Sequence, residues 1–186
     1  MAAGGVGAPP GRLGCGEVMS RTEALLGSAA FFVIAPGTIA GLIPWLVTHW
    51  RIREGASQSL SIAGVLLIVP SLALLIECFM RFATKGLGTP APVAPPRHLV
   101  VTGAYRFVRN PMYVAVLGLI FGQMLLFGHA ALLAYGVAMW MGFHLFVYFY
   151  EEPTLREAFP EDYDAYSKAV PRWLPRITPW SLSAEG

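Results

Sequence analysis

The chain has 186 residues, of which 55% are hydrophobic and only 13% are charged, so one domain is expected and an ordinary soluble protein is excluded. The net charge of +2 is small, no run of basic residues indicates a nucleic-acid partner, and no Cys/His spacing indicates a bound metal. The composition therefore favours an integral membrane protein whose main partner is the lipid bilayer.

Residues 1–20 are rich in Gly, Ala and Pro and are expected to form a flexible tail, which leaves residues 21–186 as one domain. Four apolar stretches follow, and a helix needs about 20 such residues to cross a bilayer. The predicted spans cover residues 24–48, 61–82, 111–127 and 130–150. The expected fold is therefore all-α and integral to the membrane, with about four transmembrane helices.

Short sequence signals predict how these spans are shaped and connected. Pro36 and Pro44 interrupt the first stretch, so we expect a kinked or broken helix there. Only Gly128 and His129 separate the third and fourth spans, which predicts a tight antiparallel helical hairpin. Because facing positions in a hairpin are equidistant from its turn, residues just after the fourth span return to the start of the third.

The Arg and Lys residues are distributed unevenly between the two sides of the predicted spans. Eleven of them lie on the side shared by the N-terminus, the 83–110 connection and the C-terminal tail. Only Arg51 and Arg53 lie on the other side. Since positive residues are retained in the cytoplasm, we expect both termini to be cytoplasmic.

Two segments on that side are expected to close a cytosolic pocket. The first is loop 83–110, whose Gly- and Pro-rich beginning predicts extended chain. The second is residues 154–169, where apolar residues recur at spacings of three and four and predict one amphipathic surface helix. The tail beyond it contains Arg172 and Trp173, which we interpret as an anchor at the membrane interface, with a fold of these residues back over the pocket as the alternative.

Polar residues concentrate in residues 97–113, which contain three Arg, one His, two Tyr and the only Asn of the chain. Asn110 and Pro111 predict a helix start, because Asn caps a helix and Pro needs no amide hydrogen at the first position. The free backbone amides of such a start, preceded by Arg106 and Arg109, suit a carboxylate or a phosphate.

Glu151 and Glu152 follow the last predicted span and are expected to face this corner. Two interpretations are open. In the first, the carboxylates form only salt bridges with Arg106 and Arg109 and hold the hairpin to the loop. In the second, acceptors on one side and donors on the other form a pocket for a zwitterion that bears an ammonium and a carboxylate.

These motifs resemble the isoprenylcysteine carboxyl methyltransferase family and the related phospholipid methyltransferases, in their bacterial-type branch. The resemblance covers roughly residues 75 to 176. The motifs that carry it are Gly88-Thr89-Pro90-Ala91-Pro92, Arg97-His98-Leu99-Val100, Gly103-Ala104-Tyr105, Arg109-Asn110-Pro111-Met112-Tyr113 and Glu151-Glu152.

The resemblance implies an integral membrane methyltransferase of a bacterial inner membrane that uses S-adenosyl-L-methionine. It further implies that one of the two acids takes the amino group of the cofactor. The implied cofactor contacts are His98, Leu99, Val100, Val101, Tyr105, Asn110, Pro111, Met112, Tyr113, Glu151 and Glu152. No catalytic residue is assigned, because methyl transfer from a sulfonium requires alignment and exclusion of water rather than a protein nucleophile.

The implied reaction is carboxyl O-methylation of an isoprenylcysteine-type substrate, that is, a prenylated or other lipophilic acceptor that enters from the lipid side. Val147 stands where the eukaryotic carboxyl methyltransferases carry a substrate-binding Arg, and Asn110 stands where they carry His. The alternatives are therefore a thiol or a phospholipid amine as acceptor. A non-catalytic membrane protein or transporter that retains the fold is the alternative from another functional class.

Four residues are candidates for contact with the acceptor: Glu77, Arg109, His144 and Tyr148. Glu77 also forms an i,i+4 pair with Arg81, for which a plain ion pair is the simpler explanation. A packed His is likewise the simpler explanation for His144, although an ionisable group within a span is a functional candidate by default.

Overall fold

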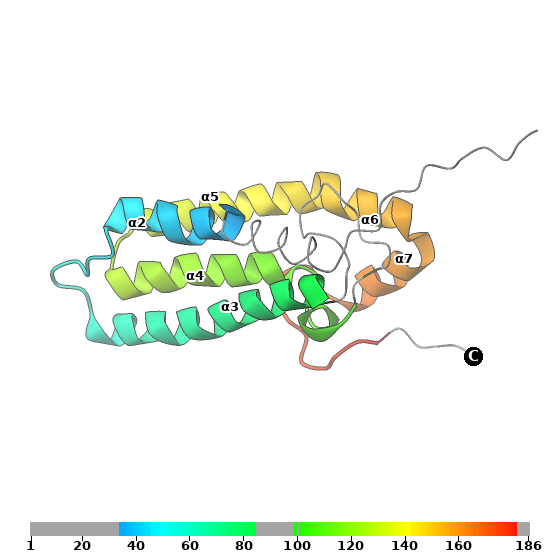
Figure 1. Cartoon of the computed structure of the whole chain (residues 1–186), viewed down its shortest axis with the longest axis horizontal. Coiled ribbons are helices and arrows are strands. Elements are labelled where there is room, and N and C mark those ends of the chain that lie inside the picture. The colour runs from blue at the N-terminus through cyan, green and yellow to red at the C-terminus, as the bar shows by residue number, and fades with distance from the viewer. Residues whose placement is uncertain (1–33, 85–98, 100, 182–186) are drawn as a thin grey trace, which may run out of the picture.

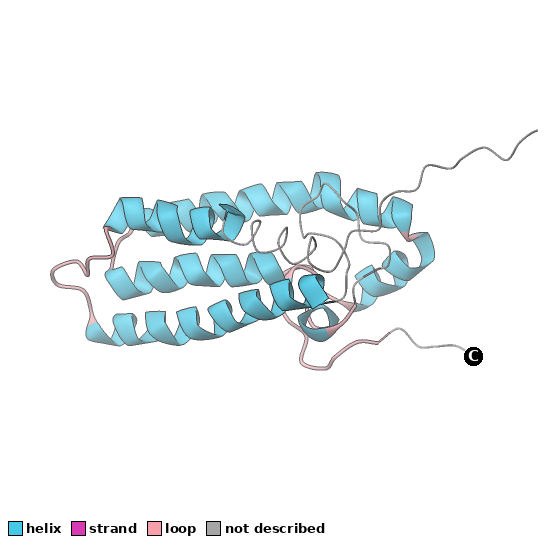
Figure 2. Cartoon of the chain, in the orientation of Figure 1, coloured by secondary structure: helices cyan, strands magenta, loops and turns pink. Residues whose placement is uncertain are grey.

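The computed structural model describes residues 34–84, 99 and 101–181. Every regular element in these ranges is a helix (Figure 2), as predicted. The predictions for the tail 1–20, for residues 24–33 and for residues 85–98 lie outside the described residues. The elements in chain order are η1 (Thr38–Leu42), α2 (Ile43–Thr48), α3 (Gln58–Thr84), η2 (Gly103–Arg106), α4 (Pro111–Phe127), α5 (Ala131–Phe146), η3 (Val147–Glu151), α6 (Glu152–Ala158) and α7 (Pro160–Ala169).

The long helices run side by side along the long axis of the molecule, with α4 between α3 and α5 (Figure 1). η1 and α2 lie against α4 and α5. The connection 49–57 lies at one end of this bundle, whereas η2, α6, α7 and the C-terminal tail gather at the other end (Figure 1). The polar corner predicted from the sequence is therefore at the end that also holds the tail.

Close packing of α3 on α4 depends on small residues. A methyl group added to Gly64 would lie 2.6 Å from the carbonyl oxygen of Gly122 and 2.6 Å from the amide nitrogen of Leu126. A methyl group on Gly122 would lie 2.6 Å from Cγ1 of Ile68. Small residues let membrane helices approach closely, so that backbone atoms contribute to packing and an apolar core can form between them. Leu75, Phe79, Ala115, Val116, Leu119 and Ile120 form that core.

The first described helix contains a π-helical turn, which agrees with the expected irregularity at its prolines. Pro44 has no amide hydrogen, so the carbonyls of Ile39 and Ala40, five and four residues earlier, cannot be satisfied by it. Gln123 donates to the Ala40 carbonyl at 2.7 Å, and the Tyr135 hydroxyl donates to the Ile39 carbonyl at 2.9 Å. Two other helices thus supply the donors that proline cannot, which fixes this helix on the bundle.

The fourth apolar stretch continues as a helix beyond its predicted end at residue 150. A second π-helical turn, η3, precedes Pro153, and the widened turn accommodates the proline ring within one helix that runs from Ala131 to Ala158. The prediction of a single surface helix over residues 154–169 is wrong. Phe159 has φ −138° and ψ 66°, because Pro160 disfavours a helical conformation in the residue before it, and α7 starts anew at Pro160.

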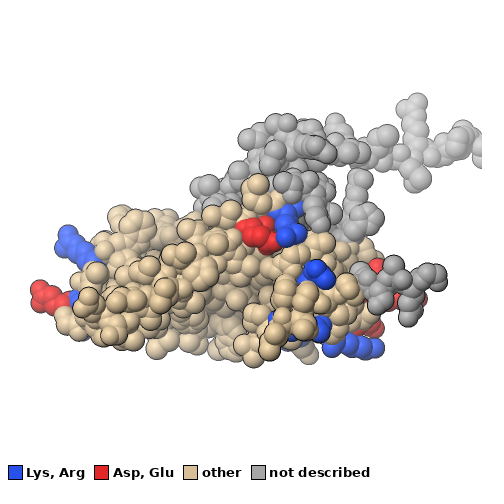
Figure 3. Space-filling view, turned by 90° about the horizontal axis from the view of Figure 1, so that it is seen from below, with Lys and Arg blue, Asp and Glu red and all other residues tan. Residues whose placement is uncertain are grey.

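Two helices of the described chain are long and apolar enough to cross a membrane, namely Gln58–Arg81 and Ala131–Ala158. Two shorter apolar helices, Ile34–Thr48 and Pro111–Phe127, accompany them. Large apolar side chains on α3 and α5 point outward, including Leu66, Val69 and Met141. Figure 3 shows the resulting surface, where a broad uncharged band separates the charged side chains at one end from those that begin near the middle of the view.

Candidate functional site

The start of α4 forms the corner of the candidate site. Pro111 occupies the first helical turn, as predicted, and Asn110 is the residue before it. The Asn110 side chain does not cap the helix, contrary to the expectation. Its amide group donates instead to the carbonyl of Arg172 at 3.2 Å, because the C-terminal tail passes directly beside the corner. The buried Asn110 therefore connects two parts of the chain rather than completing one helix.

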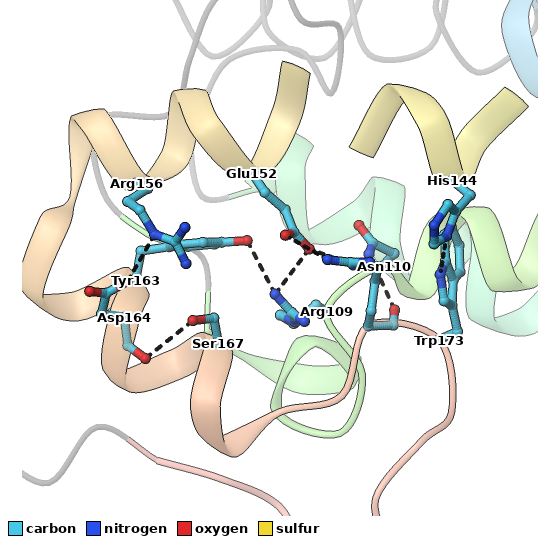
Figure 4. Close-up of polar contacts among 10 residues, drawn as sticks. Arg109, Asn110, His144, Glu152, Arg156, Tyr163, Asp164, Ser167 and Trp173 are labelled. Atoms are coloured by element: carbon cyan, nitrogen blue, oxygen red, sulfur yellow. Dashed lines mark hydrogen bonds and ion pairs between the residues drawn. The ribbon is translucent and has the colours of Figure 1, made fainter. Parts of the chain in front are cut away.

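The carboxylate of Glu152 is held by two guanidinium groups (Figure 4). Arg109 donates through Nη1 to Oε1 at 3.0 Å. Arg172 donates through Nε to Oε1 at 2.7 Å and through Nη2 to Oε2 at 2.8 Å, which is a bidentate fork. Hydrogen bonds between ionised partners are stronger than neutral ones, and the Glu152 side chain is only 13% exposed. The hydrogen bonds that Arg172 donates to Glu152 also raise the pKa of Arg172.

Glu151 has a different environment from its neighbour. Its Oε2 accepts a hydrogen bond of 3.2 Å from the hydroxyl of Tyr113, which stacks on Phe143. The described residues form no ion pair with Glu151, whereas they form two with Glu152. Glu151 is therefore the acid of the pair that can accept a cationic ligand group.

Tyr105, on η2, is half-buried and lies near this acid. Burial raises the pKa of Tyr105 well above its ordinary value, and the nearby Cys78 and Glu151 side chains add to the increase. The phenol therefore stays protonated. Its backbone carbonyl accepts a hydrogen bond of 2.7 Å from the hydroxyl of Tyr166 on α7, which fixes η2 in place.

The C-terminal tail is bound to the segment before α4 by backbone hydrogen bonds. The Arg109 amide donates to the Pro171 carbonyl at 2.9 Å, and the Arg176 amide donates to the Phe107 carbonyl at 2.9 Å. Further along, the Trp180 amide donates to the Arg106 carbonyl at 3.0 Å, and Nε of Arg106 donates back to the Trp180 carbonyl at 2.7 Å. The tail thus folds back beside the start of α4, in agreement with the alternative interpretation of Arg172 and Trp173, and their anchoring at the membrane interface stays a prediction.

Trp173 connects the C-terminal tail to α5. Its indole N–H donates to Nδ1 of His144 at 3.1 Å (Figure 4). An indole nitrogen can only donate, so Nδ1 of His144 carries a lone pair and a neutral ring holds its proton on Nε2. The tail thus determines which nitrogen of His144 is available as a donor.

Part of the predicted cofactor segment has a packing role. Leu99 and Val101 lie against the buried Tyr163, Tyr166 and Val170 of α7 and the tail. His98 and Val100 lie outside the described residues. The cofactor contacts that the resemblance implies for residues 98–101 stay predictions.

The remaining acceptor candidates are placed as follows. Glu77 pairs with Arg81 one turn later on α3, in agreement with the simpler explanation of an ion pair. Tyr148 is 54% exposed, and the guanidinium of Arg172 lies 5.7 Å from the centre of its ring. Arg109 is committed to Glu152 and lies 3.4 Å from the hydroxyl of Tyr163. Among the described residues, no three acidic, His or Cys side chains form a group that could hold a metal ion.

The chemistry of the corner fits a zwitterion. Glu151 supplies an acceptor for an ammonium group. On the other side, Nε of Arg109 is buried and has no hydrogen-bond partner among the described residues. A buried donor without a partner is costly, so a ligand carboxylate at this nitrogen would be stabilising.

Sequence reasoning did not include Tyr163, Arg172 and Trp173 among the site residues, although it considered that the last two fold back over the pocket. Tyr163 was part of the apolar pattern of a surface helix, and its hydroxyl gave no separate signal. For the tail, the available signal was two polar or aromatic residues between Pro171 and Pro175, where extended chain leaves side chains free to contact other elements.

A family model described as phospholipid methyltransferase matches residues 59–162 of the chain. No curated protein and no solved structure shows significant similarity to it. The matched residues run from the start of α3 to α7 and include the Arg109 corner and both acids. The chain belongs to the phospholipid methyltransferase family.

Proposed function

We propose that this protein transfers a methyl group from S-adenosyl-L-methionine to a lipophilic acceptor in a membrane. The observation that carries the proposal is the pair of complementary groups at one corner: the Glu151 carboxylate, which has no cationic partner among the described residues, and the buried unpartnered Nε of Arg109. Family membership supports a methyltransferase, and the charges of the corner match the amino-acid end of this cofactor.

Each residue of the corner then has a separate role. Glu151 binds the ammonium group of the cofactor, and Tyr113 orients the Glu151 carboxylate. Arg109 and the backbone amides at the start of α4 bind the cofactor carboxylate, since a helix N-terminus favours anions. Glu152 does not contact the cofactor but neutralises Arg109 and Arg172. This assignment chooses between the two acids, which the sequence leaves equivalent.

When bound, the cofactor supplies an electrophilic methyl group on a sulfonium. The protein therefore has to align the acceptor with that group and exclude water. The half-buried Tyr105, the tail and α7 enclose this end of the bundle and supply the exclusion. A carboxylate or a thiolate acceptor needs no base, and so no residue is assigned to proton transfer.

We infer two candidate acceptors. The motif resemblance favours the carboxylate of an isoprenylcysteine-type substrate. The matched family description and the buried, apolar Val147 favour a phospholipid amine instead, because a valine at this position offers no charge to a carboxylate. We further propose four transmembrane helices and cytoplasmic termini in a bacterial inner membrane, supported by the two long apolar helices and by the distribution of Arg and Lys.

Two measurements test these proposals. Calorimetric titration of the detergent-purified protein with S-adenosyl-L-methionine should give saturable binding that Glu151→Ala abolishes. Absence of binding at millimolar cofactor would sink the proposal. Membranes given methyl-labelled cofactor should then incorporate label. Release of the label as methanol in base identifies a carboxyl ester, and base-stable label in extracted lipid identifies an amine.

A further inference from the structure

We propose that Arg172 is a positioning residue of the cofactor site, which acts through Glu152 and Asn110 to reserve Glu151 for the cofactor. The inference rests on the proposed function, because it assumes that the corner at Arg109 binds the amino-acid end of S-adenosyl-L-methionine. It extends the site to the C-terminal tail, a segment that lies after the residues matched by the family model.

Arg172 takes part in a closed circuit of contacts. Its guanidinium holds Glu152 at 2.7 and 2.8 Å, and Glu152 accepts from Arg109 at 3.0 Å. The backbone of Arg109 returns to the tail at the Pro171 carbonyl, at 2.9 Å. Asn110 closes the circuit with its hydrogen bond of 3.2 Å to the Arg172 carbonyl. The position of the corner and the position of Arg172 therefore depend on each other.

Charge explains why the circuit matters for a cationic ligand group. Glu152 faces two guanidinium groups, and both of its oxygens accept hydrogen bonds. An ammonium group nearby gains little from a carboxylate that is already neutralised, and it is repelled by the two guanidinium groups. It gains most from Glu151, whose carboxylate accepts a hydrogen bond from the neutral Tyr113 hydroxyl. The bidentate fork of Arg172 thus makes two adjacent acids chemically distinct.

Removal of the Arg172 side chain would leave Glu152 with Arg109 as its single cationic partner. The Glu152 carboxylate could then turn and compete with Glu151 for the same ammonium group. The Arg172 carbonyl would lose the constraint that aligns it with Asn110. An ammonium group drawn toward Glu152 would move the cofactor carboxylate away from Nε of Arg109, and the loosened corner would no longer hold that nitrogen in place. Both effects weaken cofactor binding without removing any group that contacts the cofactor.

The rest of the tail is attached independently, so the effect of the substitution stays local. Arg176 and Trp180 hold the tail to Phe107 and Arg106 through backbone hydrogen bonds of 2.9 and 3.0 Å. The hydrophobic cluster around Tyr166 and Val170 also remains. A variant at position 172 is therefore expected to keep its fold, and a change in cofactor affinity can be separated from unfolding.

The test uses the full chain in detergent micelles and compares Arg172→Gln, Arg172→Lys and Arg156→Gln. Arg156 is the matched control, because it also pairs with a carboxylate, Asp164 at 2.9 Å, but on the exposed surface. We expect Arg172→Gln to raise the Kd for S-adenosyl-L-methionine about tenfold or more, as for loss of one partner of a desolvated charge pair. Arg172→Lys keeps the charge but not the fork and should be intermediate. The control should bind as the wild type does.

Kinetics supply a readout that a purely structural role would not move. For Arg172→Gln, the KM for the cofactor should rise while kcat at saturating cofactor stays within about twofold, since no transition-state contact is lost. A fall in kcat and in Tm at unchanged KM would overturn the inference.

The remaining outcomes are equally decisive. Wild-type binding together with an unchanged Kd in Arg172→Gln overturns the inference and leaves the proposed function intact. No binding by the wild type refutes the proposed function, and the inference falls with it. If Arg172→Gln does not fold, Arg172→Lys decides: wild-type affinity in that variant overturns the inference, and weaker affinity supports it.

Discussion

The indole N–H of Trp173 lies 3.1 Å from Nδ1 of His144, so a residue of the C-terminal tail is bonded to a ring in the middle of a long apolar helix. The two rings are also stacked, with centres 6.0 Å apart. Mutation separates much of the packing from the hydrogen bond, because phenylalanine keeps an aromatic ring at this position but has no N–H donor.

Trp173→Phe should therefore lower the free energy of unfolding by about 1 kcal/mol, the net value of one hydrogen bond. Nitrogen NMR of the wild type should show the His144 proton on Nε2, and this preference should weaken in the variant. Trp140→Phe is the control. Trp140 packs on the same His144 ring, and within the described part of the chain the two side chains share no hydrogen bond. Equal effects of the two substitutions would contradict the assigned bond.

Replacement of Glu152 by Gln should lower stability, whereas replacement of Glu151 by Gln should abolish cofactor binding. Glu152→Gln leaves Arg109 and Arg172 without their carboxylate in a largely buried site, and should cost about 3 kcal/mol of stability. Glu151→Gln removes no ion pair of the described residues and should leave Tm nearly unchanged, while it abolishes measurable cofactor binding. Thermal unfolding in detergent and calorimetric titration measure the two effects. The reverse pattern would reassign the cofactor contact to Glu152.

Contact between α3 and α4 should not tolerate a methyl group at Gly64. In Gly64→Ala the new carbon meets backbone atoms of Gly122 and Leu126, which cannot rotate away, so the helices must separate. A destabilisation of about 1–3 kcal/mol is expected from such overpacking. Gly142→Ala on α5 is the matched control, since no atom lies within 4 Å of the added carbon. Alanine favours helix there, so the control should be neutral or slightly stabilised.

Gln123→Leu should lower the stability of the protein, because Pro44 leaves the Ala40 carbonyl dependent on the Gln123 side chain for a donor. The leucine keeps the volume of the side chain but removes the donor to the Ala40 carbonyl, which proline cannot replace. An unsatisfied buried carbonyl costs about 1–3 kcal/mol. Tyr135→Phe, which removes the neighbouring donor to Ile39, should have a similar but smaller effect because that site is less buried. Chemical denaturation in detergent distinguishes the two variants, and wild-type stability of both would refute this account of the π-turn.

Much of the helical framework was predictable because it follows from local properties. The bounds of α4 match the predicted residues 111–127, since Pro111 suits the first turn and Gly128 takes a left-handed conformation after the last. The same local reasoning placed Glu151 and Glu152 near the Arg109 corner, because distance from the Gly128 turn alone determines which residues face each other.

The sequence by itself thus determined an apolar helical chain with its charged residues at the helix ends, since hydropathy, proline and glycine act within a few residues of their positions. Only the tertiary structure decided how the two acids differ. Arg172 lies twenty positions after Glu152, and Asn110 bonds to a carbonyl sixty-two positions later. Such contacts depend on how α7 packs against Leu99 and Val101 and directs the tail back to the corner. No local pattern encodes that path, because the free energy that favours it arises from surfaces that meet only in the folded chain.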